Sequence, residues 1–222
     1  MEQFFKNGQI VLFQGDSVTD CGRNRRNRDG SLGGITPRNM ALGSGYPLKI
    51  KLMYDILFKD NKVRFINRAV SGDRARDLIE RYERDVKSVC PDFMSVLIGV
   101  NDTWRRFDSD DPTSEEQFRS DYDTFLSMTK SDFPDIGLLI IEPFAFTQHP
   151  DRRGWDDDLA GKRRVAKEMA EKYGAYFMPA HDIMQRDLEH FDLLTLSPDG
   201  VHPAPQGHAV LAAAYMQTLG II

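Results

Sequence analysis

The chain has 222 residues, of which 41% are hydrophobic and 28% are charged, and its formal net charge is −5. These fractions are typical of globular proteins and exclude a disordered chain. The net negative charge argues against bulk binding to nucleic acid, which normally needs a basic surface. Apolar runs at residues 96–98 and 138–141 are far too short to span a bilayer, so no membrane association is expected. The length predicts one domain over residues 1–222.

The N-terminal sequence and the cysteines predict the compartment. Residues 1–7 lack the basic region and apolar stretch of a secretory signal. Cys21 and Cys90 have no C-x-x-C spacing, and two cysteines are too few for a disulfide framework. We therefore expect a cytoplasmic protein whose cysteines are free thiols without a role in the chemistry.

Short apolar runs bounded by polar, Gly or Pro residues predict buried strands along the chain. In chain order they are residues 10–13, 63–66, 93–98, 136–141 and 175–178. Amphipathic segments with the period of a helix lie between them. Their apolar residues are Leu48, Leu52, Met53, Ile56 and Leu57 in the first, and Phe118, Tyr122, Phe125 and Leu126 in the second.

Local signals place the helix ends. A capping box, Thr113-x-x-Glu116, begins the second helix. A third helix is expected over residues 156–173, ended by Gly174, and a last one over residues 206–219. Alternating strands and helices predict an α/β fold, a three-layer α/β/α sandwich with a five-stranded parallel sheet. Ligands of such sheets bind beyond the carboxyl ends of the strands.

Small and polar residues occupy the positions where this rule expects a ligand. They lie at residues 14–20, 67–73 and 99–102, each after a predicted strand, and at residues 199–203, before the last helix. Taken singly, Gly15-Asp16-Ser17 is equally consistent with a turn and helix cap, Asn101-Asp102 is more often a turn or cap, and Gly72 more often only relieves the backbone. Four such segments at sheet-end positions favour a functional site.

These segments resemble the four sequence blocks of the SGNH hydrolases of the GDSL type, which carry Ser, Gly, Asn and His in that order. The matching residues are Gly15-Asp16-Ser17, Gly72, Gly99-Val100-Asn101-Asp102 and Asp199-x-x-His202. The resemblance implies a flavodoxin-like SGNH hydrolase fold and a serine esterase. Val18 departs from the Leu of the GDSL motif, and Asp73 follows the second-block glycine where many members differ.

The chemistry of these residue types supports a catalytic triad. A serine hydroxyl needs a base within hydrogen-bond reach, and the base needs an orienting partner. His202 and Asp199 meet this need for Ser17, because a single turn can aim both side chains in one direction. The chain order Ser, Asp, His is that of α/β-hydrolases, but the G-x-S-x-G elbow of that fold is absent.

The resemblance also implies the oxyanion hole, which stabilises the negative charge on the ester oxygen during attack. Its donors are the backbone N–H of Ser17, the backbone N–H of Gly72 and the side-chain amide of Asn101. Glycine lets the backbone approach substrate closely, and asparagine is a donor that needs no protonation. No cofactor and no metal ion are expected.

Within this family the chain is most similar to intracellular acetylxylan esterases. The shared stretches include residues 15–23, 45–46, 70–72 and 199–203 and the motif Asn101-Asp102-x-Trp104-Arg105. The resemblance implies an acetylated oligosaccharide as substrate and a homo-oligomer. The absence of a signal segment agrees with a substrate small enough to be imported.

Candidate substrate-binding residues are Asp16, Trp104 and Arg105. For Asp16 we favour a cap of the turn after the strand over a contact with substrate. Trp104 either stacks on a sugar ring or packs a loop, and Arg105 either binds sugar hydroxyls or forms a surface ion pair. The aromatic residues Phe144, Phe146 and Trp155 either line the same cleft or belong to the core. His208, inside the last helix, is expected to be exposed or satisfied in the core.

Three other interpretations remain open. A lysophospholipase or acyl thioesterase keeps the same triad but needs an apolar channel for a long chain. A metal-dependent hydrolase would use Asp16, Asp102, Asp199 and His202 as hard ligands. A non-catalytic carbohydrate-binding protein on the same fold is the third, because fold alone does not establish activity. The basic stretch at residues 23–28 is expected to be solvated, to cover the site or to contact another subunit.

Overall fold

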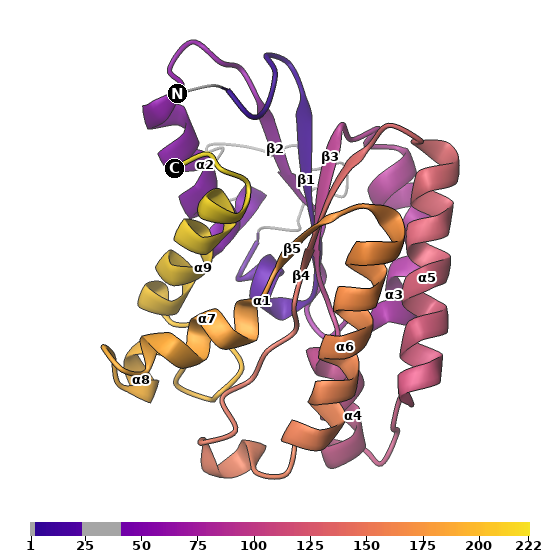
Figure 1. Cartoon of the computed structure of the whole chain (residues 1–222), viewed down its shortest axis with the longest axis vertical. Helices are drawn as coiled ribbons and strands as arrows, with labels where there is room; N and C mark the ends of the chain where they lie inside the picture. The colour runs from indigo at the N-terminus through magenta and orange to yellow at the C-terminus, as the bar shows by residue number, and fades with distance from the viewer. Residues whose placement is uncertain (1–2, 24–40) are drawn as a thin grey trace.

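The computed structural model describes residues 3–23 and 41–222. One sheet of five parallel strands has the order β2-β1-β3-β4-β5 (Figure 1). The strands are β1 (Ile10–Gly15), β2 (Arg64–Asn67), β3 (Phe93–Leu97), β4 (Gly137–Ile141) and β5 (Tyr176–Met178). The predicted strands are therefore confirmed to within two residues at either end. The strand order reverses between β1 and β3, and this point is where a ligand is expected.

Helices pack against both faces of the sheet, which confirms the three-layer α/β/α fold (Figure 1). They are α1 (Ser17–Asp20), α2 (Tyr46–Leu57), α3 (Ala75–Glu80), π-helix η2 (Glu83–Lys87), α4 (Val100–Asp108), α5 (Glu115–Asp132), 3₁₀ helix η3 (Pro150–Arg152), α6 (Asp156–Tyr173), α7 (Ala180–Asp187), α8 (Leu193–Leu196) and α9 (Pro205–Thr218). Helices α2, α7 and α9 cover one face, and α3, α5 and α6 cover the other.

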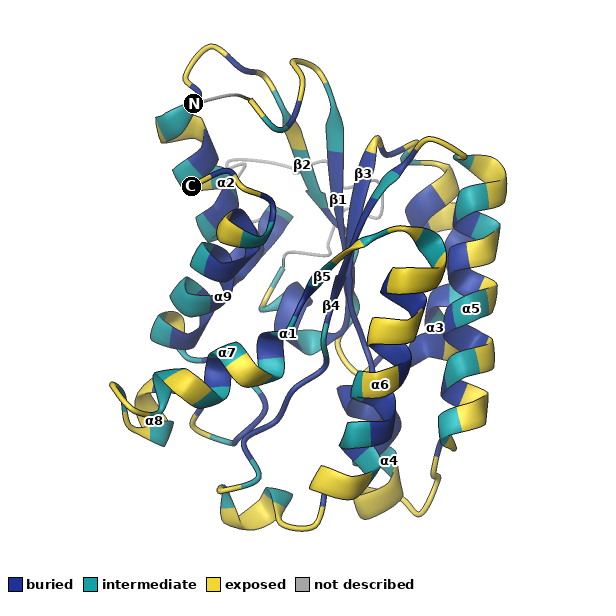
Figure 2. Ribbon diagram, in the orientation of Figure 1, coloured by how far each residue is buried: buried dark blue, intermediate teal, exposed yellow. Residues whose placement is uncertain are grey.

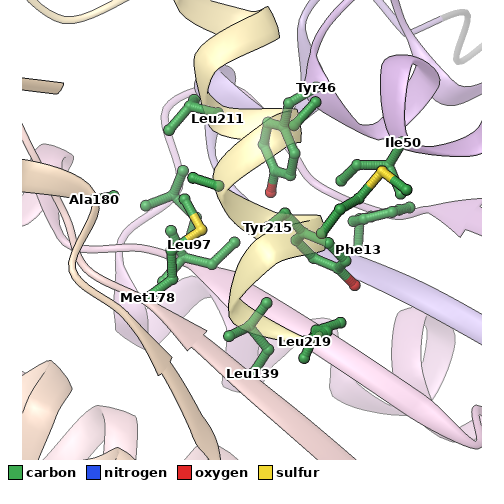
Figure 3. Packing of buried hydrophobic residues seen from close by; sticks show 14 of the residues in the cluster. Phe13, Tyr46, Ile50, Leu97, Leu139, Met178, Ala180, Leu211, Tyr215 and Leu219 are labelled. Atoms are coloured by element: carbon green, nitrogen blue, oxygen red, sulfur yellow. The ribbon is translucent and has the colours of Figure 1, made fainter. Parts of the chain in front are cut away.

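Alternate residues of each central strand enter two separate hydrophobic cores, because successive side chains of a strand point to opposite faces. Phe13 and Leu139 join the core beneath α2 and α9. Leu12 joins the core beneath α3, α5 and α6. Figure 3 shows Tyr215 of α9 facing Phe13, and their ring centroids are 5.8 Å apart. Each such buried side chain contributes roughly 1.5–3 kcal/mol. The central strands and the inner helix faces form the buried interior in Figure 2.

Two helix details differ from the sequence prediction. Helix α5 is capped by Ser114, whose side chain accepts from the backbone N–H of Gln117, one residue later than the predicted capping box. Helix α2 buries Ile50 and Tyr54, whereas Leu52 and Ile56 of the predicted apolar stripe are 45% and 69% exposed. Aromatic packing decides this orientation, because Tyr54 lies 4.6 Å from Phe58 and 5.5 Å from Phe65 between ring centroids.

The remaining helix predictions hold. Helix α6 spans the predicted residues 156–173, and Gly174 ends it in the left-handed conformation with φ +61°. Helix α9 begins at Pro205 and ends at Thr218, one residue earlier at each end than expected. No helix within residues 3–23 and 41–222 combines the length and apolar character needed to cross a membrane. Apart from Arg23, the basic stretch at residues 23–28 lies outside the described residues.

Candidate active site

The candidate nucleophile lies where β1 meets α1 at the carboxyl edge of the sheet. Gly15 ends β1 with φ +148°, and a Cβ there would lie 2.3 Å from the carbonyl oxygen of Leu97. Only glycine therefore lets β1 approach β3 this closely. The next residue, Asp16, caps α1 by accepting from the backbone N–H of Val18 at 3.0 Å. This turn places Ser17 at the first position of α1.

Ser17, His202 and Asp199 form a continuous hydrogen-bonded chain. His202 Nε2 lies 2.8 Å from Ser17 Oγ, and His202 Nδ1 lies 2.6 Å from Asp199 Oδ2. Because the carboxylate can only accept, Nδ1 carries the proton and Nε2 is left to accept from the serine hydroxyl. The structure thus brings together residues that are 185 positions apart in the chain.

A local turn builds the acidic member of this chain. Asp199 Oδ1 accepts from the backbone N–H groups of Val201 and His202 at 2.9 and 2.7 Å. These bonds leave the second oxygen, Oδ2, for the imidazole. The spacing of three residues between Asp199 and His202 therefore fixes both the backbone turn and the side-chain contact.

The electrostatics of the pair suit a general base and its orienting partner. The hydrogen bond to Asp199 raises the pKa of His202 above its ordinary 6.5. Burial raises the pKa of Asp199, but hydrogen bonds from the His202 side chain and from two backbone N–H groups outweigh it and hold that pKa well below its usual range. Asp199 is therefore ionised near neutral pH and stabilises a positive imidazolium.

The predicted oxyanion donors lie in the segments that follow three neighbouring strands, β2, β1 and β3. Gly72 has φ +92° in the loop after β2, and the backbone N–H of Val70 in that loop donates to Gly15 O at 3.0 Å. Asn101 lies in the first turn of α4, and its Nδ2 donates to the carbonyl of Asp73 at 2.9 Å. An amide nitrogen has two hydrogens, so this bond leaves one for a developing oxyanion.

Two buried carboxyl groups flank these donors. Asp16 is 1% exposed and Asp102 is fully buried, and each has one oxygen bonded to a backbone N–H, from Val18 and from Ala75 respectively. Burial raises the pKa of each carboxyl to about 7. Both groups therefore carry less negative charge near neutral pH than an exposed aspartate, which limits their repulsion of an oxyanion at Ser17.

Asp16 and Asp102, two of the ligands considered for a metal ion, bind backbone N–H groups. Asp16 caps the turn after β1, as the sequence favoured, and Asp102 holds the N-terminus of α3. Within residues 3–23 and 41–222, no three His, Cys, Asp or Glu residues are grouped so that they could hold a metal ion.

Trp104 and Arg105 have different surroundings. Trp104 is partly buried, and its ring centroid is 5.8 Å from that of His202 and 5.5 Å from that of Trp155. Trp104 thus lies at the imidazole side of the triad. Arg105 Nη1 is 2.6 Å from Asp108 Oδ2, which is the ion-pair alternative considered for it. Phe144 and Phe146 are buried in the core beneath α2 and α9. Trp155 is buried in a separate small cluster, and Trp104 packs against that cluster.

A cavity of about 460 Å³ opens beside the serine. It is lined by Ser17, Val18, Cys21, Gly22, Ser44, Ser71, His202, Pro203 and His208. The imidazole of His208 is buried and hydrogen-bonded, which is one of the two alternatives considered for it. Its Nδ1 accepts from the backbone N–H of Tyr46, and burial lowers its pKa to about 4.

Both cysteines are free thiols, as predicted. Cys21 nevertheless lies on this cavity, which its sequence position did not indicate.

Arg152 is a neighbour of the triad that the sequence did not reveal. Its Nε donates to the carbonyl of Asp199 at 3.0 Å, and its guanidinium lies 4.3 Å from the ring centroid of Trp104 and 4.8 Å from that of Trp155. Its positive charge opposes protonation of His202. In the sequence, Arg152 is one of several charged residues in the segment after the fourth strand. Nothing in the sequence distinguishes it from them.

Arg152→Gln is expected to move the acidic limb of the kcat/KM profile to higher pH. A general base at His202 acts only when it is neutral, so we expect kcat/KM to rise as pH increases through a pKa above 6.5. Removing the positive charge of Arg152 raises that pKa further. The measurement is kcat/KM for an aryl acetate between pH 5 and 9, with exposed Arg153→Gln as the matched control. A shift to lower pH, or an equal shift in the control, would contradict this expectation.

Known proteins are similar to this chain over most of its length. The model of the GDSL-like lipase/acylhydrolase family matches residues 13–210. An acetylxylan esterase from Geobacillus stearothermophilus is 32% identical over 219 residues, which cover 96% of this chain and 95% of that protein.

Solved structures are similar over almost the whole chain. A crystal structure of an acetylxylan esterase from Geobacillus stearothermophilus has a TM-score of 0.83 and 31% identity, covering 98% of this chain and 97% of that one. A candidate GDSL-like lipase from Parabacteroides merdae has a TM-score of 0.88 and 27% identity, covering 98% of both chains.

Proposed function

The chain belongs to the GDSL-like lipase/acylhydrolase family and is a carboxylic ester hydrolase, and we propose that it removes acetyl groups from oligosaccharides, with residues 1–222 as one catalytic domain. The observation that carries this proposal is the chain of short contacts from Ser17 through His202 to Asp199. The 32% identity to an acetylxylan esterase supports the choice of substrate. Self-association stays a prediction from the family resemblance, and a cytoplasmic location stays a prediction from the N-terminal sequence and the cysteines.

The proposed reaction begins with attack of Ser17 Oγ on the acetyl carbonyl carbon. His202 Nε2 takes the serine proton, and Asp199 stabilises the resulting imidazolium. Negative charge develops on the carbonyl oxygen, where the N–H groups of Ser17 and Gly72 and the amide of Asn101 donate to it.

The tetrahedral intermediate collapses with release of the sugar hydroxyl, which receives the proton from His202. Water then attacks the carbonyl carbon of the acetyl-serine while His202 Nε2 takes its proton. The bond to Ser17 Oγ breaks, Oγ receives that proton from His202, and acetic acid leaves.

The surroundings of the triad support an ester carried by a sugar. Ser44 and Ser71 lie beside Val18 and Pro203 in the lining of the cavity next to Ser17, so the cavity offers both polar and apolar contacts. At the other side of the triad, the partly exposed Trp104 ring lies next to His202. We propose that this ring contacts the sugar that carries the ester, because a flat apolar surface stacks well on a sugar face.

The acyl preference and the sugar are tested with two substrate series. Aryl acetate and aryl octanoate are compared by kcat/KM, and we expect at least about a tenfold preference for acetate, the factor that 1.4 kcal/mol of differential transition-state binding gives. Acetate release is then followed on acetylated xylo-oligosaccharides and other acetylated sugars, with Ser17→Ala as the blank. A preference for octanoate would favour the lysophospholipase or thioesterase alternative.

A further inference from the structure

Arg81 is a buried cation in contact with the segments that carry candidate oxyanion donors. It follows α3, and its side chain is only 8% exposed. Burying a guanidinium costs free energy unless its N–H groups are paired, so the partners that it meets there carry information. None of the four family blocks contains this residue, and its sequence position, at the end of a short helix, suggests only a surface charge.

Three partners of the Arg81 side chain belong to the segments that carry the oxyanion donors, and a fourth, Asp85 of η2, accepts from Nη1 at 3.1 Å. Nη2 donates to the carbonyl of Gly15 at 3.3 Å, two residues before Ser17. Nη1 donates to the carbonyl of Arg68 at 2.6 Å, and Nε donates to Asp73 Oδ2 at 2.6 Å. Arg68 and Asp73 lie on either side of Gly72 in the loop after β2. Arg81 therefore contacts both the serine turn and the glycine loop.

The third donor is connected through Asp73. The carboxylate of Asp73 binds Arg81, while the carbonyl of the same residue accepts from Asn101 Nδ2 at 2.9 Å. The position of the Asn101 amide thus depends on Asp73, whose carboxylate pairs with Arg81. One guanidinium links the three segments that carry Ser17, Gly72 and Asn101.

Only arginine suits this position, because its planar group donates five hydrogens in fixed and divergent directions. A lysine amine retains the charge but is a single point on a flexible stem. It can pair with Asp73 or reach one carbonyl, but it does not span the partners that Arg81 holds together. Oxyanion holes are sensitive to such changes, since a 1 Å misplacement of catalytic groups costs about 10²-fold in rate.

We propose that Arg81 is a positioning residue that holds the three oxyanion donors in a single geometry. The inference rests on the proposed function, because it concerns the same oxyanion hole. It assigns to Arg81 an effect on the transition state and none on substrate contact, because its side chain is buried and is not among the residues that line the cavity beside Ser17.

The test is Arg81→Lys, with Arg84→Lys as the matched control. Arg84 donates to both oxygens of Asp85 at 3.0 and 2.7 Å and shares that partner with Arg81, but its side chain is 63% exposed. For an aryl acetate, we expect Arg81→Lys to lower kcat about 10- to 50-fold, within the cost of such a misplacement, and to leave KM within about twofold. Arg84→Lys should leave both constants within about twofold of the unchanged chain, as surface substitutions usually do.

Affinity for a tetrahedral adduct separates positioning from general destabilisation. An alkyl trifluoromethyl ketone forms a hemiketal with a catalytic serine and places an oxyanion in the hole. Its affinity should fall by the same factor as kcat in Arg81→Lys and stay unchanged in Arg84→Lys. Melting curves identify the folded fraction. A second variant, Asp73→Asn, weakens the ion pair but keeps the carbonyl that binds Asn101. It should lower kcat and ketone affinity together, by a smaller factor than Arg81→Lys. It replaces Arg81→Lys if that variant fails to fold.

The outcomes distinguish this inference from the proposed function. If the unchanged chain is active and the folded Arg81→Lys variant has a kcat within twofold of it, the role of Arg81 is overturned and the proposed function stands. A loss of kcat without a loss of ketone affinity would overturn it as well. An unchanged chain that hydrolyses no ester would overturn the proposed function and this inference with it. Activity on aryl acetate without activity on acetylated sugars would overturn only the substrate, and the result for Arg81 would still stand.

Discussion

Ser17→Ala is expected to lower kcat on an aryl acetate by about 10⁶-fold, the cost typical of removing the nucleophile from a Ser-His-Asp triad. The loss is this large because Ser17 Oγ is the atom that His202 Nε2 contacts at 2.8 Å, and no acyl-enzyme forms without it. Residual hydrolysis comes from the oxyanion hole and from substrate binding, which alanine leaves in place. KM should change little, since the hydroxyl contributes mainly to the transition state.

Two measurements check this result. Steady-state kinetics give the loss of kcat, and a fluorophosphonate probe should label the unchanged chain at Ser17 and leave the variant unlabelled. Ser44→Ala is the matched control, because Ser44 lines the same cavity while its Oγ donates to the carbonyl of Cys21. Activity that survives Ser17→Ala and is abolished by a chelator would support the metal-dependent alternative. An unlabelled but folded unchanged chain would support the binding-protein alternative.

Asn101→Ala is expected to lower kcat about 10²- to 10³-fold, which is the usual cost of one oxyanion donor. The amide suits this role because Nδ2 donates one hydrogen to the carbonyl of Asp73 and has a second hydrogen, which we expect to bind the substrate oxygen. The interaction strengthens as charge develops, so kcat falls while KM stays within about threefold.

The control for Asn101→Ala must separate lost catalysis from a disturbed helix. Thr103→Val serves this purpose, because Thr103 is buried in the same α4 helix and its hydroxyl donates to Asp158 at 2.8 Å. It removes one hydrogen bond from α4 without touching the oxyanion hole. We expect Thr103→Val to lower the melting temperature but to leave kcat within about threefold, since its hydrogen bond is worth about 1 kcal/mol of stability. Equal kcat in Asn101→Ala and the unchanged chain would remove Asn101 from the oxyanion hole.

Most of the fold was predictable because local patterns and global packing agree. Buried central strands of a parallel sheet are continuous apolar runs, and each run lies in the sheet where expected. The errors occurred where neighbours in space outweighed local preference. In α2, the stripe through Leu52 and Ile56 faces outward because Ile50 and Tyr54 pack into the aromatic core instead.

The candidate site was predictable to the extent that its residue types occur in short motifs. Asp199 and His202 are three residues apart, so one turn sets their contact, and the sequence alone suggested it. Arg152 and Arg81 gave no such signal. Charged residues are mostly exposed, and the sequence offers no way to single out the two arginines that lie against the site.

By itself, the sequence determined the order of strands and helices and the residue types at the carboxyl ends of the strands. These properties depend on hydrophobic period and on turn chemistry, which act within a few residues. Only the tertiary structure decided that His202 Nε2 lies 2.8 Å from Ser17 Oγ and that Arg81 reaches Gly15, Arg68 and Asp73 together. Those contacts join segments from different strands, and their distances follow from sheet register and helix packing, which no local pattern specifies.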